Sequence, residues 1–334
     1  MKYKITVIGA GSWGTALARI VSDNSYDVMI YDINEETVQE INQYHTNVKK
    51  LPNGTLNEKV IATNDLNHAL HFGDIILLVV PTKVLRSVLQ EIKKYIDQPK
   101  LFVNASKGIE PNTFKRVSEI VYEEIDSKLI EGFVALTGPS HAEEVMVQML
   151  TVITAASTNI KHSRIIQKIF SNQTYFRVYA LHDLIGAELG GSLKNIIALA
   201  SGILVGLGYG DNAKAALVTR GLIEMQKLAV ALGAKKKTLY GLTGVGDLVV
   251  TCFSEHSRNF QAGKKIGSGK DLEKTLSEMT MVVEGARSCE AAYFAAQKYH
   301  IDTPIINAVY DIIYLHHDPR NVISQLMQRS LKVE

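Results

Sequence analysis

The sequence predicts an α/β protein, with an N-terminal doubly wound, Rossmann-like domain over residues 1–181 and an all-helical C-terminal domain over residues 182–334. The N-terminal half alternates short apolar runs with helical stretches, as expected for a parallel sheet that is covered on both faces. A glycine-rich turn follows the first apolar run. Beyond residue 182, convincing strand patterns stop and long segments with helical periodicity take over.

A strand, a tight turn and a helix form the first predicted unit. The apolar run Lys4 to Ile8 leads into the turn Gly9-Ala-Gly-Ser-Trp-Gly14, and a helix follows from Thr15. In a dinucleotide-binding site, Gly9 allows the tight turn, Gly11 the close approach of backbone to pyrophosphate, and Gly14 the packing of helix on strand. The N-terminus of the helix then faces the phosphates.

The next predicted strand, Asp27 to Tyr31, is followed by Asp32. This acid lies about twenty residues after the turn, where a carboxylate accepts hydrogen bonds from the ribose hydroxyls of adenosine. Its charge would repel the 2′-phosphate of NADP(H), so NAD(H) is the favoured cofactor. The alternative is that Asp32 only caps a turn before Asn34 and that the glycines serve packing alone.

Later segments complete both predicted domains. The remaining strands of the first are expected at Asp74 to Val80, Leu101 to Ala105, Phe133 to Leu136, Leu150 to Ala155 and Phe176 to Tyr179. Helices of the second are expected at Asn212 to Leu232, Lys270 to Met279 and Cys289 to Lys298. No low-complexity linker separates the two, so a helix starting at Asp183 should join them, and the cleft between them is the expected ligand site.

The composition argues against several classes of protein. With 36 Lys plus Arg against 34 Asp plus Glu, the chain has no field to attract nucleic acid or an anionic membrane, and a small metabolite is the expected partner. The sequence shows no cleavable N-terminal segment and no run typical of a membrane span, which favours a cytoplasmic protein without membrane insertion. Cys252 and Cys289 make no disulfide framework, and Cys252 with His256 lacks the second ligand pair of a zinc site, so no metal is expected.

One lysine stands out in an apolar stretch. Between Leu184 and Gly210 the only formally charged side chains are Glu188 and Lys194. Burial disfavours the charged form of an amine and lowers its pKa toward the range where it exchanges protons. Lys194 is therefore the candidate general acid and base; the alternative is a structural lysine that reaches solvent or pairs with a carboxylate.

Two loops are expected at the carboxyl edge of the sheet, where doubly wound folds bind ligands. Lys107 follows the strand that ends near Ala105, within reach of the nicotinamide end of the cleft. The segment Thr137-Gly-Pro-Ser-His-Ala142 follows another strand and offers backbone N–H groups and the Ser140 hydroxyl. The alternative is that these are ordinary loop residues.

A second glycine cluster, Gly241 to Asp247, follows a helical segment and therefore does not fit a dinucleotide fingerprint. It is expected to permit close packing of the backbone. Asp247 could orient a lysine by hydrogen bonding or cap the segment that begins at Leu248. Further on, Ser257-Arg-Asn259 precedes a predicted helix, and an arginine fork at a helix N-terminus suits a phosphate group.

These motifs together resemble NAD(P)-dependent glycerol-3-phosphate dehydrogenase of the soluble bacterial type. The resemblance rests on several segments in the expected order, which cover nearly the whole chain: Ser106-Lys-Gly108, Gly138-Pro-Ser140, Glu188-Leu-Gly-Gly-Ser-Leu-Lys-Asn195, Gly210-Asp-Asn-Ala-Lys-Ala-Ala216, Thr243-Gly-Val-Gly-Asp-Leu248, Ser257-Arg-Asn259 and Val282-Val-Glu-Gly285. It implies reversible reduction of dihydroxyacetone phosphate to sn-glycerol 3-phosphate, which supplies glycerophospholipid synthesis.

The resemblance also implies roles for individual residues. Lys194 matches the family's proton donor and acceptor. The matching substrate-binding residues are Lys107, Gly138, Ser140, Asp247, Ser257, Arg258 and Asn259, with Arg258 on the phosphate. The matching cofactor contacts, beside Gly9, Gly11, Gly14 and Asp32, are Ser12, Trp13, Lys107, Ala142, Arg258, Val282 and Glu284. Asp32 departs from the bacterial pattern, which often tolerates NADP(H), so the choice between the two cofactors stays open.

Two other functions remain as alternatives. A related NAD-dependent hydroxy-acid or hydroxyacyl dehydrogenase would share the glycine turn without needing Ser257-Arg-Asn259 in this form. A non-catalytic NAD(H)-binding sensor would keep the first domain and could dispense with a buried lysine. The expected assembly is a homodimer, with the uncharged helix from Asn195 to Gly206 serving as core or as subunit contact.

Overall fold

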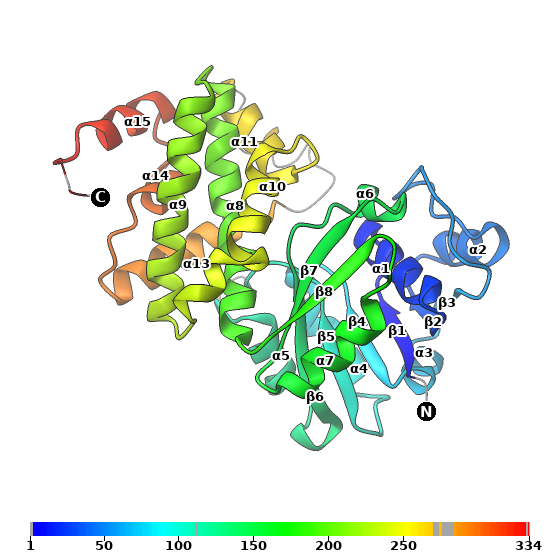
Figure 1. Ribbon diagram of the computed structural model, residues 1–334. Coiled ribbons are helices and arrows are strands. Elements are labelled where there is room, and N and C mark those ends of the chain that lie inside the picture. Colours follow the sequence, from blue (N-terminus) through cyan, green and yellow to red (C-terminus); the bar gives the residue numbers. More distant parts are fainter. Residues whose placement is uncertain (1–2, 111–112, 270–273, 276–282, 332, 334) are drawn as a thin grey trace.

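The computed structural model describes residues 3–110, 113–269, 274–275, 283–331 and 333. Figure 1 shows a twisted sheet with helices on both faces, which we call the sheet region, beside a bundle of helices, the helical region. The eight strands are β1 (Lys4–Ile8), β2 (Asp27–Tyr31), β3 (Ile61–Thr63), β4 (Ile75–Leu78), β5 (Lys100–Asn104), β6 (Ile130–Thr137), β7 (Thr151–Ala156) and β8 (Phe176–Leu181). The predicted α/β fold class is confirmed.

The strand order is β3-β2-β1-β4-β5-β6-β7-β8. Neighbouring strands from β3 to β6 are parallel. Strand β7 runs antiparallel to β6, and β8 runs parallel to β7. The predicted parallel pairing is therefore present from β3 to β6, and the sheet departs from it between β6 and β7. The physical reason is the connection from β6 to β7, whose only helix is the five-residue α6 (Ala142–Met146), too short to cross a face of the sheet.

Helices cover the sheet in two layers because the strand side chains are apolar on both faces. One buried cluster joins the sheet to Leu17 of α1 (Ser12–Asp23) and Ile166 of α7 (Ile160–Phe170). The other joins it to α4 (Thr82–Ile92) and α5 (Val117–Glu124). The remaining helical segments of this region are α2 (Glu35–Tyr44), α3 (Leu66–Phe72) and the short η1 (Ser127–Leu129).

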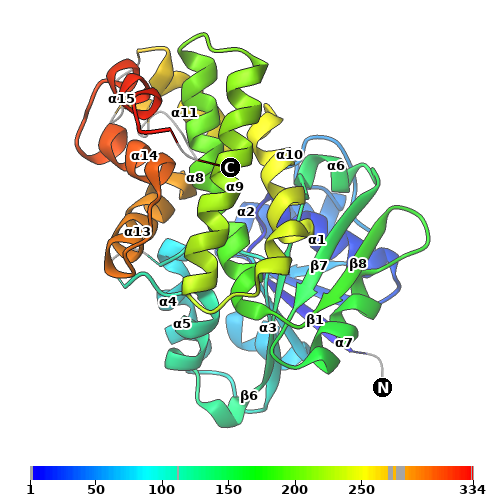
Figure 2. The ribbon, with the colours of Figure 1, turned by 60° about the vertical axis from the view of Figure 1, so that its left-hand side comes forward.

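The helical region is built around α8 (Leu184–Gly206). Around it lie α9 (Asp211–Ala231), η2 (Lys236–Tyr240), η3 (Leu242–Gly246), α10 (Asp247–Phe253), α11 (Arg258–Gly267), α13 (Glu284–Lys298), α14 (Pro304–Tyr314) and α15 (Pro319–Met327). Figures 1 and 2 show α8 and α9 side by side. The predicted helices at residues 212–232 and 289–298 are confirmed as α9 and part of α13, whereas most of the one at 270–279 lies outside the described residues.

Glycines let α8 and α11 pack with their backbones in contact. A Cβ atom on Gly202 of α8 would lie 2.0 Å from the carbonyl oxygen of Phe260, and one on Gly263 of α11 would lie 2.1 Å from that of Leu199. Among the described helices, α8 alone has the length and apolar composition of a membrane span, and most of it is buried inside the protein. The helix is the core of the region that carries Lys194.

Two buried carboxylates fix the start of α8. Asp183 precedes the helix and accepts hydrogen bonds from Gly186 N at 3.0 Å and from Thr238 Oγ1 at 2.6 Å. Glu188, one turn further on, accepts from Ser118 N at 2.8 Å and from Arg116 Nη1 at 2.9 Å, both at the start of α5. This second contact joins the helical region to the sheet region and so places Lys194 relative to the sheet.

Candidate active site

The glycine turn has the shape that a dinucleotide needs. Gly9 has a φ of +111°, and its N–H donates to Tyr31 O at 2.9 Å. A Cβ atom on Gly14 would lie 2.0 Å from Gly9 O, so α1 could not pack this closely with any other residue there. At Gly11, by contrast, no described atom lies within 4 Å of the Cβ position. Gly11 therefore leaves room for a ligand rather than for the protein's own atoms.

The N-terminus of α1 is open beside this space. Gly11 occupies the position before the helix, and no side chain among the described residues caps the first N–H groups. Unpaired N–H groups and the positive end of the helix dipole suit a phosphate. The turn therefore fits the pyrophosphate of a dinucleotide cofactor.

Gly11→Ala tests this interpretation directly. Gly11 has φ −68° and ψ 175°, which alanine adopts without strain, so we expect the protein to fold normally. The added methyl group would occupy the space left for the pyrophosphate, and the Kd for NADH should rise about tenfold. The matched control is Gly210→Ala, because Gly210 precedes α9 with an extended backbone and equally open space. An unchanged Kd in a titration of NADH fluorescence would move the pyrophosphate away from this turn.

Asp32 lies at the carboxyl end of β2 and joins two turns. Its Oδ2 accepts from Ala10 N at 2.7 Å and its Oδ1 from Asn34 N at 2.9 Å. The capping role that the sequence left open is therefore present. Two further lone-pair positions remain on the carboxylate, which can still accept from ribose hydroxyls. Of the other turn residues, Ser12 donates to Lys50 O at 3.0 Å and Trp13 packs against the core.

A buried carboxylate lies at the centre of the contact between the two regions. Asp247 is the first residue of α10 and only 1% exposed. Its Oδ1 accepts from Lys194 Nζ of α8 at 2.5 Å, and its Oδ2 accepts from Lys107 Nζ at 3.1 Å. Lys107 lies just beyond β5, and its Nζ also donates to Gly138 O at 3.4 Å. The structure thus brings four predicted site residues together from four parts of the chain.

The amine of Lys194 is suited to exchanging protons near neutral pH. Its pKa is lowered to about 7, chiefly because burial disfavours the charged form; the charge of Asp247 opposes this shift and the neighbouring charge of Lys107 adds to it. A second acceptor fixes the amine: Lys194 Nζ donates to Thr251 Oγ1 at 2.6 Å, and that hydroxyl donates to Asp247 O. A lysine with this pKa and fixed position can act as a general acid or base.

The second glycine cluster forms the π-helical turn η3, which delivers Asp247 to this position. A Cβ atom on Gly244 would lie 1.9 Å from Leu239 O, so the predicted close packing of the backbone is present. Thr243 ties the turn to its neighbours, since its hydroxyl lies 3.1 Å from that of Thr137 in β6 and donates to Ala187 O of α8 at 3.0 Å. Irregular helical turns of this kind recur at functional sites.

The start of α11 is held by a helix cap and by a hydrogen bond to α13. The Ser257 hydroxyl accepts from Phe260 N at 3.2 Å and caps the helix, and Asn259 Oδ1 accepts from Gly285 N at 2.7 Å. Arg258 is exposed, and its charge acts on Glu284 at the start of α13. Glu284 in turn accepts from Thr82 Oγ1 of α4 at 3.1 Å. Val282 lies outside the described residues.

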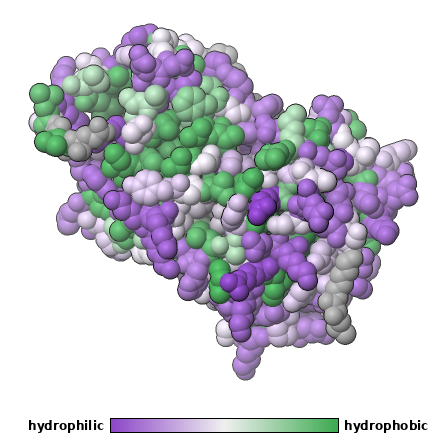
Figure 3. Space-filling model, viewed as in Figure 1, coloured by the Kyte–Doolittle hydropathy of each residue, from purple (hydrophilic) through white to green (hydrophobic). Residues whose placement is uncertain are grey.

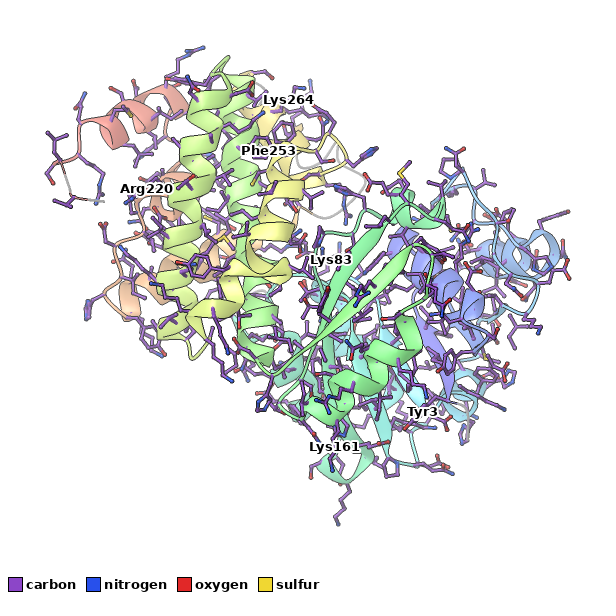
Figure 4. The ribbon with its side chains drawn as sticks, in the orientation of Figure 1. Tyr3, Lys83, Lys161, Arg220, Phe253 and Lys264 are labelled. Carbon is purple, nitrogen blue, oxygen red and sulfur yellow. The ribbon has the colours of Figure 1, made fainter. Side chains whose placement is uncertain are left out.

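Two further predicted residues lie in the loop after β6. Gly138 has a φ of +140°, and the Ser140 hydroxyl donates to its carbonyl oxygen at 3.0 Å. Ala142, 8% exposed, begins α6. Figure 4 shows Lys83, at the start of α4, between the two regions, and its charge also acts on Glu284.

The sequence comparisons decide the family. Residues 4–163 match the model of the N-terminal part of NAD-dependent glycerol-3-phosphate dehydrogenase, and residues 183–324 match that of its C-terminal part. The chain belongs to this family. Membership confirms the resemblance drawn from the motifs and the prediction of an NAD(P)-dependent dehydrogenase.

Relatives of known name support the assignment. The glycerol-3-phosphate dehydrogenase (NAD(P)+) of Bacillus thuringiensis strain Al Hakam is 50% identical over 331 residues, which are 99% of this chain and 97% of the relative. The crystal structure of glycerol-3-phosphate dehydrogenase from Coxiella burnetii is 35% identical with a TM-score of 0.91, covering 98% of this chain and 99% of that one. The enzyme from Saccharomyces cerevisiae is 28% identical with a TM-score of 0.85, covering 98% and 100%.

Two residues near the site were missed by reading this family's motifs in the sequence. Thr251 lies one helical turn after Asp247 on the same face of α10, and this four-residue spacing could have indicated it. His141 lies next to Ser140, but no local pattern marks it, because its ring partner His256 comes from the other region. The described residues contain no cluster of three or more metal-ligand side chains, and both cysteines are free and buried.

Proposed function

We propose that the protein catalyses the reversible reduction of dihydroxyacetone phosphate to sn-glycerol 3-phosphate, with NAD(H) preferred over NADP(H). The observation that carries this proposal is the buried Lys194–Asp247 pair, which Lys107 joins from the sheet region. We assign cofactor binding to residues 1–181 and the catalytic and most substrate contacts to residues 182–334. The product, sn-glycerol 3-phosphate, is a precursor of glycerophospholipids. We therefore propose that the enzyme works in the cytoplasm and supplies this precursor to glycerophospholipid synthesis.

Reduction of a ketone needs a hydride on carbon and a proton on oxygen. When bound, the nicotinamide ring supplies the hydride. Lys194, in its ammonium form, stabilises the negative charge that develops on the ketone oxygen and then donates the proton. In the reverse direction the neutral amine accepts the proton of the substrate hydroxyl. Asp247 and Thr251 hold the amine in place through both steps.

The substrate phosphate is assigned to the start of α11. Arg258 offers an exposed guanidinium there, at the positive end of the helix dipole. Holding the phosphate fixes the ketone against Lys194, with binding energy from a part of the substrate that does not react. Gly138, Ser140, Ser257 and Asn259 complete the proposed substrate contacts, and Ser12, Trp13, Asp32, Lys107, Ala142, Arg258, Val282 and Glu284 the cofactor contacts.

Arg258→Gln should raise the KM for dihydroxyacetone phosphate by about 10- to 100-fold with a smaller change in kcat, because it removes a charge-assisted hydrogen bond to the phosphate. The matched control is Lys264→Gln, which removes one positive charge from the last turn of the same helix. Lys264, which is labelled in Figure 4, pairs with Glu255 on the surface. The KM of the Lys264→Gln variant should therefore stay within about twofold of that of the original enzyme. If the KM for dihydroxyacetone phosphate were the same in the two variants, the substrate phosphate would have to bind away from Arg258.

The overall function is tested by oxidation of NADH and, separately, NADPH with dihydroxyacetone phosphate. Unphosphorylated dihydroxyacetone serves as the control substrate. Turnover that requires the phosphate supports the proposal, and a higher kcat/KM for NADH supports the role of Asp32. Turnover with a hydroxy acid or a hydroxyacyl thioester instead would favour the related dehydrogenases, and tight NADH binding without turnover of any ketone would favour a sensor.

We also propose that the protein assembles as a homodimer through its helical region. A mainly apolar groove of about 880 Å³ lies between α9, α14 and α15, and Met327 and Leu331 at its edge are 82% and 101% exposed. Figure 3 shows apolar side chains gathered over α9 and its neighbours. A second copy of the chain would cover these side chains. Light scattering after size-exclusion chromatography should give twice the chain mass of 36.9 kDa, and a monomer would overturn this assignment.

A further inference from the structure

Two histidines from different regions contact each other. His141 lies between Ser140 and α6 in the sheet region, and His256 lies between α10 and α11, two residues before Arg258. Their ring centroids are 5.5 Å apart, with the planes inclined by 55°. The ring pair therefore stands beside both loops that carry the proposed substrate contacts.

One ring nitrogen of this histidine pair lacks a hydrogen-bond partner among the described residues. His141 Nε2 is buried, and it has no hydrogen-bond partner among the described residues. A buried polar nitrogen without a partner is unfavourable, and such atoms in native proteins are usually satisfied by a ligand or an ordered water. The contact with His256 restrains the ring but offers Nε2 no hydrogen bond in the described structure.

The charges around His141 come from both regions. Burial lowers the pKa of the imidazole, and the ammonium groups of Lys107 and Lys194 lower it further, whereas the carboxylates of Glu144 and Glu143 on α6 raise it. The ring is therefore neutral at pH 7, with one N–H donor. The same interactions show that the imidazole lies within the electrostatic field of both lysines that contact Asp247.

We propose that His141 is a substrate-binding residue whose Nε2–H donates a hydrogen bond to the phosphoryl group of the substrate. This inference rests on the proposed function. A neutral donor binds a phosphate oxygen without adding a third positive charge next to Lys107 and Lys194, and so without lowering the pKa of Lys194 further. The ring of His141 contacts that of His256, which lies two residues before Arg258, and this contact places His141 at the phosphate end rather than at the ketone.

The test compares variants that keep or remove the donor. His141→Phe keeps a ring against His256 but removes both nitrogens, and we expect its KM for dihydroxyacetone phosphate to rise about tenfold with kcat within about twofold. His141→Gln places an amide N–H near the Nε2 position and should stay within about threefold of the original KM. The side-chain amide of His141→Asn reaches only the Nδ1 position, so this variant should resemble His141→Phe. Comparison of the Gln and Asn variants therefore tests the hydrogen bond from Nε2 even if the Phe variant fails to fold.

Two further measurements exclude indirect effects. The kcat/KM for unphosphorylated dihydroxyacetone and the Kd for NADH should be unchanged in all three variants. The control is His71→Phe, the same chemical change on α3, where His71 pairs with Asp97 away from the cleft.

Each outcome has one meaning. Unchanged KM values in His141→Phe and His141→Asn, with normal turnover by the original enzyme, would overturn this inference and leave the proposed function intact. A raised KM for NADH alone would place the nitrogen on the cofactor and also overturn it. Absence of turnover in the original protein would overturn the proposed function itself, and with it this role of His141.

Discussion

Replacing Lys194 with alanine should reduce kcat for dihydroxyacetone phosphate by at least about a thousandfold. A positioned general acid contributes about 10²- to 10⁴-fold to a rate, and this ammonium also stabilises the developing alkoxide. The Kd for NADH should stay within about twofold, because the glycine turn lies in the sheet region, away from α8. Steady-state kinetics and NADH fluorescence titration measure the two quantities.

The controls for this prediction separate chemistry from folding. Lys194→Met keeps most of the volume of the buried side chain and should lose as much activity as Lys194→Ala. Lys161→Ala removes an exposed lysine of α7, which Figure 4 labels far from the contact between the regions, and should keep full activity. If Lys194→Met retained substantial turnover while binding NADH normally, another group would have to supply the proton.

Asp247→Asn should have the second largest effect, through the pKa of Lys194. The carboxylate favours the ammonium form of Lys194, so its loss lowers a pKa that burial has already brought to about 7. At about pH 7.5 the fraction of ammonium falls, and we expect kcat for ketone reduction to drop by about a hundredfold. Asparagine keeps the size of the side chain, which limits the change to the lost charge.

The direction of the pH dependence distinguishes this cause from simple misfolding. In the original enzyme, reduction requires the ammonium form and should slow as the pH rises through about 7, whereas oxidation of glycerol 3-phosphate requires the amine and should accelerate. In Asp247→Asn both transitions should move to lower pH, so acid partly restores reduction. The control is Asp211→Asn, which removes an exposed carboxylate from the first residue of α9 and should leave both profiles unchanged. Unshifted profiles in Asp247→Asn would show that its carboxylate does not set the pKa of Lys194.

The sequence predicted those parts of the fold that depend on local patterns. The turn from Gly9 to Gly14 contains three glycines and lies directly between a strand and a helix. Gly9 and Gly14 are required by close contacts with nearby backbone, and Gly11 leaves open space beside the turn. The edge strand β3 was missed because three residues are too few to show a period. The antiparallel direction of β7 was missed because direction depends on how the chain returns to the sheet, and strand composition does not encode that.

The part of the site that could be predicted from the sequence is the part that depends on burial. The apolar surroundings of Lys194 in the sequence indicated a buried amine, and the structure shows it 3% exposed. Its partner remained open, because Asp247 lies 53 residues away and reaches it only through the turn η3. The unpaired nitrogen of His141 could not be predicted at all, since a missing partner is a property of the assembled cleft.

The ion pair between Lys107 and Asp247 crosses from one region to the other, so its geometry depends on how far the two regions are apart. Lys107 disfavours the charge on Lys194, and moving it away from Asp247 would therefore increase the proton affinity of that amine. Thermodynamic linkage makes this relation reciprocal: a ligand that draws the regions together promotes release of the proton, and protonation favours their separation. The distance between the two regions and the acidity of Lys194 are therefore linked.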